Sequence, residues 1–182
     1  MRRSYIASAY FDGPNGTKRF VPTPVALTLR GPLIPISVSP TGETIELVKQ
    51  RDQPVPNTVQ LVGLIDTGAD FTSIDDDVAK KAGFPVIDTR LSKSASDRGA
   101  ESNAYPPICI TLSDIGRRFN VNRPHGSKLV GFDAIIGRDI LQHMVVVYNG
   151  ITGKFTIFYN PTDEIVVTET DLSYLRYAND AR

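Results

Sequence analysis

Short apolar runs separated by turn-forming residues recur along this chain, and this pattern predicts a mainly β protein. The run Leu61–Ile65 is interrupted only by a glycine, which predicts a strand covered on both faces. In the run Leu33–Val38, Pro35 favours an edge strand or a bulge. Further strands are expected at Val25–Leu29 and Ile108–Leu112, and Met144–Tyr148 and Phe155–Tyr159 are expected to pair as a hairpin across Asn149-Gly150.

A helical period follows the run Leu61–Ile65. Ile74, Val78 and Ala82 recur every four residues, which predicts a helix with one apolar face. Residues 73–76 have the spacing of a capping box, with Ser73 as the capping residue. Gly83 is placed to end the helix, because glycine readily adopts the conformation that follows a last helical turn.

Three consecutive acids, Asp75–Asp77, lie at the start of this predicted helix, and Lys80 and Lys81 lie at its end. This arrangement complements the helix dipole. A metal site is the alternative interpretation of the acids. His125 and His143 show no paired ligand spacing, however, so no metal and no other cofactor is expected.

Two polar stretches are predicted to lack regular structure. Residues 43–57 carry prolines at 54 and 56 and suggest either a surface loop or a lip beside a substrate site. Residues 92–103 are small and polar and have no apolar face, so a disordered surface loop is one interpretation of them.

The charges balance: 20 lysines and arginines face 20 acids among 182 residues. The chain therefore has no electrostatic reason to bind nucleic acid or a membrane. No apolar run is long enough to span a bilayer, and Tyr5–Tyr10 is too short and polar for a signal-peptide core. The single cysteine, Cys109, is expected to be a buried small apolar residue, and a cytoplasmic location is expected. A local basic group suggests a solvated face or, alternatively, an anion site: Arg117, Arg118, Arg123 and Lys128.

Asp66 is the candidate for chemistry, because it follows the apolar run Leu61–Ile65 directly. A carboxylate at this place must accept hydrogen bonds, form an ion pair or serve a function, since burying a carboxylate without a partner costs much free energy. Thr67 can donate a hydroxyl, and Gly68 lets backbone N–H groups approach the acid. The alternative is that Asp66 only caps a turn, because Asp-x-Gly is common turn chemistry.

The segment Asp66–Asp70, D-T-G-A-D, resembles the active-site loop of retropepsin-like aspartic proteases. The later segment Ile135–Leu141, I-I-G-R-D-I-L, resembles the part of that family that packs beside the loop. Within that family, the sequence is most similar in its features to the cellular and bacterial single-domain members. The resemblance implies a mainly β, single-domain acid-protease fold. It would be closed and barrel-like, with a helix after the catalytic loop and a short helix after I-I-G.

The resemblance also implies a division of the chain and a role for each matching residue. The protease domain would span 25–159, between an N-terminal extension, 1–24, and a C-terminal tail, 160–182, with a flap at about 90–105. Asp66 would be the catalytic acid. The Thr67 hydroxyl would interlock with Thr67 of a second copy across a dimer axis, and the Gly68 backbone would contact both the Asp66 carboxylate and the substrate. Ala69, in place of serine or threonine, is the residue typical of the viral members of the family at this position. Asp70 and Arg138 would form a bracing ion pair, for which Arg138→Lys should not be neutral. Ile136 and Gly137 would support the loop.

Aspartic proteases use two carboxylates that share one proton, and this chain has one D-T-G. Asp114-Ile115-Gly116 lacks the hydroxyl and does not follow an apolar strand, so it is rejected as the second acid. The resemblance therefore implies a homodimeric aspartic endopeptidase, most active at acidic pH, that cleaves extended peptide or protein substrates with a water held between two Asp66 carboxylates. The alternative is a binding or assembly module with this fold that does not cut, or whose site its own extensions close.

Overall fold

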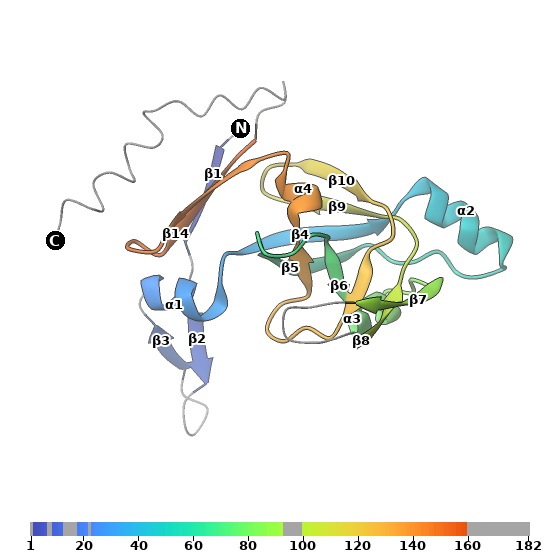
Figure 1. The fold of residues 1–182 in the computed structure, drawn as a ribbon, viewed down its shortest axis with the longest axis horizontal. Helices are drawn as coiled ribbons and strands as arrows, with labels where there is room; N and C mark the ends of the chain where they lie inside the picture. The colour runs from blue at the N-terminus through green and yellow to red at the C-terminus, as the bar shows by residue number, and fades with distance from the viewer. Residues whose placement is uncertain (1, 7–8, 13–17, 22, 93–99, 160–182) are drawn as a thin grey trace.

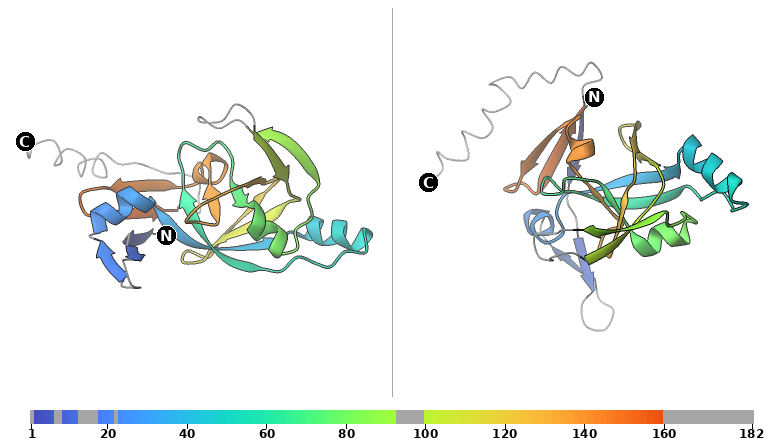
Figure 2. Two further views of the ribbon diagram at one scale, coloured as in Figure 1. Left: turned by 90° about the horizontal axis from the view of Figure 1, so that it is seen from below. Right: turned by 45° about the vertical axis from the view of Figure 1, so that its right-hand side comes forward.

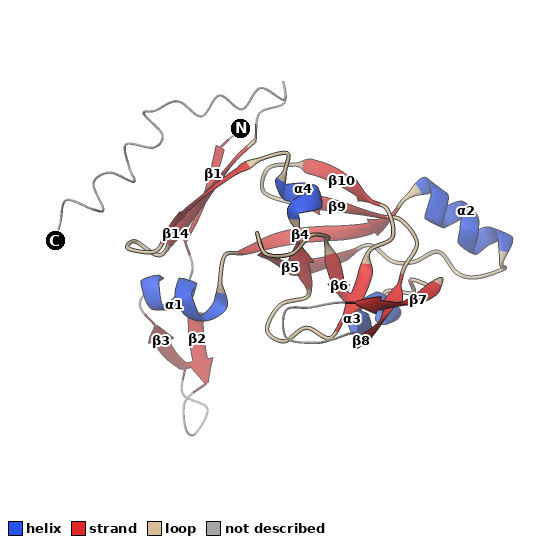
Figure 3. Ribbon diagram, in the orientation of Figure 1, coloured by secondary structure: helices blue, strands red, loops and turns tan. Residues whose placement is uncertain are grey.

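The computed structural model describes residues 2–6, 9–12, 18–21, 23–92 and 100–159 of the chain (Figure 1). Strands dominate these residues and helices are few and short (Figure 3), as the apolar pattern predicted. None of the helices in the described part of the chain is long and apolar enough to cross a membrane. The predicted C-terminal tail, 160–182, lies outside the described residues.

The largest sheet has nine strands and is mixed. In chain order they are β4 (Leu33–Pro40), β5 (Val59–Ile65), β6 (Ser73–Asp75), β7 (Asp88–Ser92), β8 (Ala100–Ala104), β9 (Ile108–Leu112), β10 (Arg117–Val121), β11 (His125–Ser127) and β12 (Ala134–Ile136). Hydrogen bonding orders them β10-β9-β4-β5-β12-β6-β11-β8-β7. Because β10 and β7 do not pair in this order, the closed barrel that the sequence suggested is not found among the described strands.

β12 lies at the centre of this sheet, between β5 and β6. It runs parallel to β5, with Ile136 beside Ile65, and antiparallel to β6, with Ala134 beside Ile74. The ends of β5 and β12 therefore lie next to each other. This arrangement brings Asp66, which follows β5, beside Gly137, which follows β12.

A second sheet has three strands, β1 (Arg2–Ile6), β14 (Lys154–Phe158) and β13 (Val145–Asn149). The hairpin predicted near the end of the chain is confirmed as the antiparallel pair β13–β14. Within the segment 1–24, β1 pairs with β14, and β2 (Ala9–Asp12) pairs with β3 (Lys18–Val21). Two buried side chains of β14, Phe155 and Ile157, join the main apolar core, so this sheet packs against the rest of the molecule.

The prediction of a strand at Val25–Leu29 is wrong, because these residues belong to α1 (Thr23–Arg30). The two neighbours Ala26 and Leu27 are buried, whereas Val25 and Leu29 are exposed. The apparent alternation therefore did not mark a buried face. Pro24, at the start of the segment, is the sequence signal that favours a helix, since proline is tolerated in a first helical turn.

The prediction of an irregular stretch at 43–57 is wrong for its first part, which forms α2 (Gly42–Gln50). The Thr41 side chain caps this helix by accepting a hydrogen bond from the Thr44 N–H at 3.3 Å. Thr44 and Val48 are buried on one face. The helix projects from the end of the molecule opposite to the second sheet (Figure 2).

The predicted helix after residue 73 exists as α3 (Asp76–Lys81), but its capping residue is Asp75 and not Ser73. Asp75 Oδ1 accepts from the Asp77 and Val78 N–H groups, each at 3.1 Å. Ser73 instead belongs to β6. Termination at Gly83 is confirmed, since this glycine has φ of +91°.

β5 is less buried than predicted. Gly63 and Ile65 are buried, but Val62 is 40% exposed, so one face of the strand is only partly covered. Pro35 lies in the part of β4 that pairs with β5 alone, because β9 pairs with β4 only from Ile36 onward. Pro35 therefore lies at a place where one side of β4 is unpaired among the described strands, as expected, although β4 as a whole lies between β9 and β5.

Truncating Ile36 should destabilise the fold strongly. Its side chain is fully buried in the core, so Ile36→Ala should lower the free energy of unfolding by about 2–5 kcal/mol through lost contacts and a cavity. Val130→Ala is the control, because Val130 is 85% exposed and should change stability by less than about 0.5 kcal/mol. Urea unfolding followed by circular dichroism would measure both. Equal losses would contradict the assignment of Ile36 to the core.

Candidate active site around Asp66

Asp66 stands at the point where β5 ends and a surface loop begins, here called the Asp66 loop (residues 66–72). Its backbone N–H donates to the Ile136 carbonyl at 3.1 Å, which continues the pairing of β5 with β12 by one residue. The sheet therefore fixes where the backbone of Asp66 lies, and the loop determines where its carboxylate points.

The Asp66 carboxylate is held from inside its own loop. Oδ1 accepts from the Gly68 N–H at 2.8 Å, and the Asp66 carbonyl accepts from the Ala69 N–H at 3.3 Å. A Cβ at residue 68 would lie only 3.1 Å from Oδ1, so glycine gives the backbone its close approach to the acid. Asp66 is half-buried, and its neighbours Thr67 and Gly68 are exposed. The loop thus presents one oriented carboxylate at the surface.

Arg138 braces the Asp66 loop from α4 (Arg138–Leu141), the short helix predicted after I-I-G. Its backbone N–H donates to the Ala69 carbonyl at 2.9 Å, and its guanidinium donates to the Thr67 carbonyl at 2.8 Å. The same guanidinium pairs with the Asp70 carboxylate. Both side chains are exposed, so this pair contributes little to stability and mainly sets the orientation of the loop.

Gly137 is the point of closest approach between the two predicted motifs. A Cβ there would lie 2.5 Å from the Phe71 carbonyl carbon and 2.9 Å from the Thr72 nitrogen. Backbone atoms cannot give way at such distances, so no other residue fits at 137 without moving the loop. The glycine thereby brings the Asp66 loop and α4 into direct backbone contact.

Thr72 and Asp139 also support the loop, and the sequence reasoning missed both. The buried Thr72 hydroxyl donates to Asp139 Oδ1 at 2.7 Å and accepts from the Gly137 N–H at 3.1 Å. The Thr72 N–H donates to Asp139 Oδ2 at 3.0 Å. The place of Asp139 in the first turn of a helix was a usable signal, since acids there often cap backbone N–H groups. No pattern among the neighbouring residues indicated a role for Thr72.

The segment assigned by position to a flap, about 90–105, includes a hairpin. β7 and β8 pair antiparallel from Asp88–Ala104 to Ser92–Ala100, and residues 93–99 lie outside the described part. Ser102 of β8 lies 3.4 Å from His125 Nδ1, and the His125 ring is 6.4 Å from the ring of Phe71, which is 66% exposed. The β7–β8 hairpin and the Asp66 loop are therefore both neighbours of β11.

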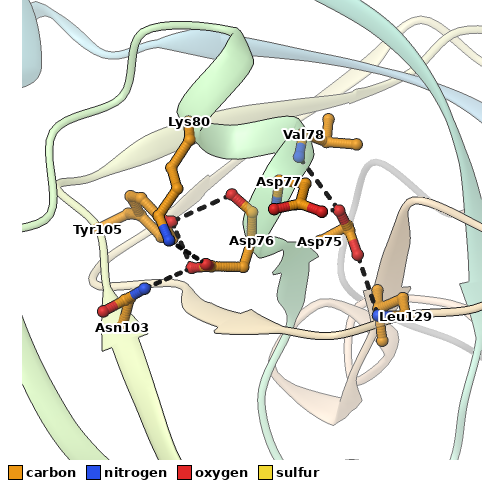
Figure 4. Close-up of polar contacts among 8 residues, drawn as sticks. All are labelled: Asp75, Asp76, Asp77, Val78, Lys80, Asn103, Tyr105 and Leu129. Carbon is orange, nitrogen blue, oxygen red and sulfur yellow. Dashed lines mark hydrogen bonds and ion pairs between the residues drawn. The ribbon is translucent and has the colours of Figure 1, made fainter.

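Asp76 is the centre of a polar group, here called the Asp76 cluster (Asp76, Lys80, Asn103 and Tyr105; Figure 4). Asp76 Oδ1 accepts from Asn103 Nδ2 at 2.6 Å and from the Tyr105 hydroxyl at 2.5 Å, and Oδ2 pairs with Lys80. Partial burial alone would raise the pKa of Asp76, but hydrogen bonds from Lys80, Tyr105 and Asn103 outweigh it and lower this pKa below its ordinary value. Burial, followed by the bond to Asp76, raises the pKa of Tyr105, which keeps its hydroxyl protonated as a donor.

The hollows beside α3 lie apart from the Asp66 loop. A groove of about 310 Å³ is lined by residues 53–54, 80 and 83–86, and another of about 440 Å³ by residues 57–61, 78 and 81–82. Neither includes a residue of the loop. Within the described residues, no group of three or more His, Cys, Asp or Glu side chains is placed to hold a metal ion.

Comparison with solved structures finds a distant likeness, and comparison with sequences finds none. No protein-family model matches the chain, and no curated protein is significantly similar to it. A solved structure described as a retropepsin-like aspartic protease from Rickettsia conorii is similar with a TM-score of 0.43 and 14% sequence identity, over 87% of this chain and 96% of that one. A likeness this distant carries no argument about the activity of this chain.

Removing the Thr72 hydroxyl should destabilise the protein. Thr72→Val keeps the shape of the side chain but leaves the Gly137 N–H and one Asp139 oxygen without this partner, which should cost about 1–3 kcal/mol. Thr28→Val is a matched control, because the Thr28 hydroxyl is exposed and, among the described residues, donates to the Pro24 carbonyl one helical turn away. Urea unfolding of both variants would test this, and a cost that is no larger for Thr72→Val would contradict it.

Because the pKa of Asp76 is lowered in the folded protein, the free energy of unfolding should depend on pH in the acidic range. A carboxyl whose pKa is lower in the folded state than its ordinary 3.8 adds stability above about pH 4, and this stability is lost as the pH falls through the lowered value. Asp76→Asn should therefore cost stability near neutral pH and cost less and less towards about pH 2. Urea midpoints measured across this range would show it. A difference from wild type that stays constant with pH would contradict the charged contacts of Asp76.

Proposed function

We propose that this protein is an aspartic endopeptidase whose active site forms from two copies of the chain, each contributing Asp66. One observation carries the proposal. The Asp66 loop presents a carboxylate at the surface, with Oδ1 fixed by the Gly68 N–H, while Arg138 holds the loop from outside. A residue that only capped a turn would not need a second segment to fix its loop.

The second acid has to come from another copy. The sequence has one D-T-G, and the Asp66 carboxylate makes no ion pair within the described residues. A two-fold axis beside the exposed Thr67 and Gly68 would bring two identical loops together, since a two-fold contact uses the same patch on both subunits. Two carboxylates at contact distance cannot both ionise, so together they would keep one proton.

The reaction that follows is the addition of water across a peptide bond. The ionised Asp66 takes a proton from the water, whose oxygen bonds to the carbonyl carbon, while the protonated Asp66 gives its proton to the carbonyl oxygen. The first carboxyl then passes a proton to the amide nitrogen, the C–N bond breaks, and a hydroxyl proton returns to the dyad. The products are a carboxylic acid and an amine. The step uses only water and the shared proton, with no cofactor.

The substrate would be an extended peptide or protein segment, held largely by main-chain hydrogen bonds. The β7–β8 hairpin is proposed as the flap that contacts its backbone. The protease domain is proposed to span 25–159, with 1–24 and 160–182 as extensions, and the protein is proposed to act in the cytoplasm. A copy that stays monomeric would hold one acid only and would act as a binding or assembly module.

Replacing the proposed catalytic acid should abolish cleavage. Asp66→Asn removes the group that takes the proton from water, so cleavage of an unfolded protein at acidic pH should fall by a factor on the order of 100 or more. Cleavage by wild type should be sensitive to pepstatin. Asp114→Asn is the matched control, because Asp114 also stands two residues before a glycine, and it should leave the rate unchanged. Undiminished cleavage by Asp66→Asn would overturn the proposal.

Mixing subunits tests the shared site directly in the same assay. If wild-type and Asp66→Asn chains exchange freely, the activity should follow the square of the wild-type fraction, because each active site needs two intact acids. Sedimentation would show that dimers form in the mixture. A linear dependence would mean that each chain acts alone, and no cleavage by a stable wild-type dimer would favour the binding module.

A further inference from the structure

The β7–β8 hairpin is joined to the rest of the large sheet by few backbone contacts. β7 is the last strand of the sheet and pairs only with β8 among the described strands. β8 in turn shares a single residue pair with β11, that of Ala104 with His125. One further backbone bond extends this pairing, from the Tyr105 N–H to the Pro124 carbonyl at 3.0 Å. The bond from the Ile87 N–H to the Ala104 carbonyl, at 2.9 Å, belongs to the hairpin itself, because it continues the pairing of β7 with β8. The backbone therefore leaves the angle of the hairpin weakly determined.

The Asp76 cluster supplies side-chain contacts at this base, in addition to the contact between Ser102 of β8 and His125 of β11. Asp76 stands in the first turn of α3, whereas Asn103 lies in β8 and Tyr105 directly follows β8. One carboxylate oxygen accepts from both of them, at 2.6 and 2.5 Å (Figure 4). Bonds to an ionised acceptor are about twice as strong as those between neutral groups. A single carboxylate thus binds the hairpin to the helix that follows the Asp66 loop.

The packing around this carboxylate leaves no room for a side chain at residue 126. A Cβ at Gly126 of β11 would lie 2.6 Å from Asp76 Oδ1 and 2.9 Å from a ring carbon of Tyr105. Tyr105 itself is fully buried. α3, β8 and β11 therefore meet at Asp76 in direct contact.

The same strand β11 leads to the Asp66 loop. His125 pairs with Ser73, the first residue of β6 after the loop, and its ring lies beside that of Phe71. On its other side His125 approaches Ser102 of β8. If the contact between β8 and β11 changed, the position of the β7–β8 hairpin relative to the candidate catalytic acid would change as well.

From this geometry we infer that Asp76 is a positioning residue of the proposed protease, which fixes the direction of the β7–β8 hairpin relative to the Asp66 loop. The inference rests on the proposed function, in which this hairpin holds the peptide. Asp76 touches no reacting atom. Its effect is on how well an extended peptide is bound, whereas the chemistry at Asp66 is unchanged once the peptide is in place.

The test compares Asp76→Ala with Asp77→Ala in the full chain. Both variants remove an acid from the first turn of α3, but the exposed Asp77 side chain makes no hydrogen bond to the described residues. With a peptide substrate, Asp76→Ala should raise KM about tenfold and change kcat by less than about twofold, while Asp77→Ala changes neither. Hydrogen exchange of the amides in 100–105 should be faster in Asp76→Ala alone.

Tyr105→Phe provides a milder second variant, in case Asp76→Ala does not fold. It keeps the ring and removes one donor, so it should shift KM and exchange in the same direction by a smaller factor. The inference is overturned if Asp76→Ala and Asp77→Ala behave alike, or if exchange rises while KM stays constant. A wild type that cleaves no peptide overturns the proposed function instead. The exchange rates report on the hairpin alone and so tell the two failures apart.

Discussion

The backbone at Gly137 packs directly against the backbone of Phe71 and Thr72, and this contact sets the geometry of the candidate site. β12 is inserted between β5 and β6, so the chain after β12 must pass the loop that connects those two strands. Only a residue without a Cβ can do so at this distance. Once Gly137 is in place, α4 starts directly against the Asp66 loop, and its first residues are within hydrogen-bonding reach.

The loop has no apolar core of its own, and polar contacts from α4 take the place of one. They divide into two kinds. The buried Thr72 hydroxyl and Asp139 form contacts whose loss would leave unsatisfied groups, so these contacts stabilise the fold. Arg138 and Asp70 are exposed, so their pairing adds little stability. The guanidinium also binds the Thr67 carbonyl, so the pairing orients the backbone of the loop, while the Gly68 N–H orients the Asp66 carboxylate.

The candidate site therefore combines a rigid part and a part that is weakly attached. The sheet holds the backbone of Asp66, and α4 holds the loop that follows it. The β7–β8 hairpin has one residue pair with β11, a few bonds beside that pair, and the Asp76 cluster. Elements with few backbone contacts open at low free-energy cost, as segments that admit a ligand must do. In the proposed protease, the charged Asp76 at the base of this hairpin would limit the direction of the hairpin.

Features that depend on neighbouring residues could be predicted from the sequence alone: the mainly β pattern, the hairpin β13–β14, the end of α3 at Gly83, and the two motifs that meet at the candidate site. The other features depend on contacts between distant segments. α1 buries the adjacent residues Ala26 and Leu27, which the alternating pattern of a strand would not do. Ser73 pairs with β12 as part of β6, so Asp75 caps α3 in its place. Thr72 meets Asp139, and Asp76 meets Asn103 and Tyr105, only after strands far apart in the chain have paired. No local spacing encodes such contacts, because their geometry is set by the order of strands in the sheet.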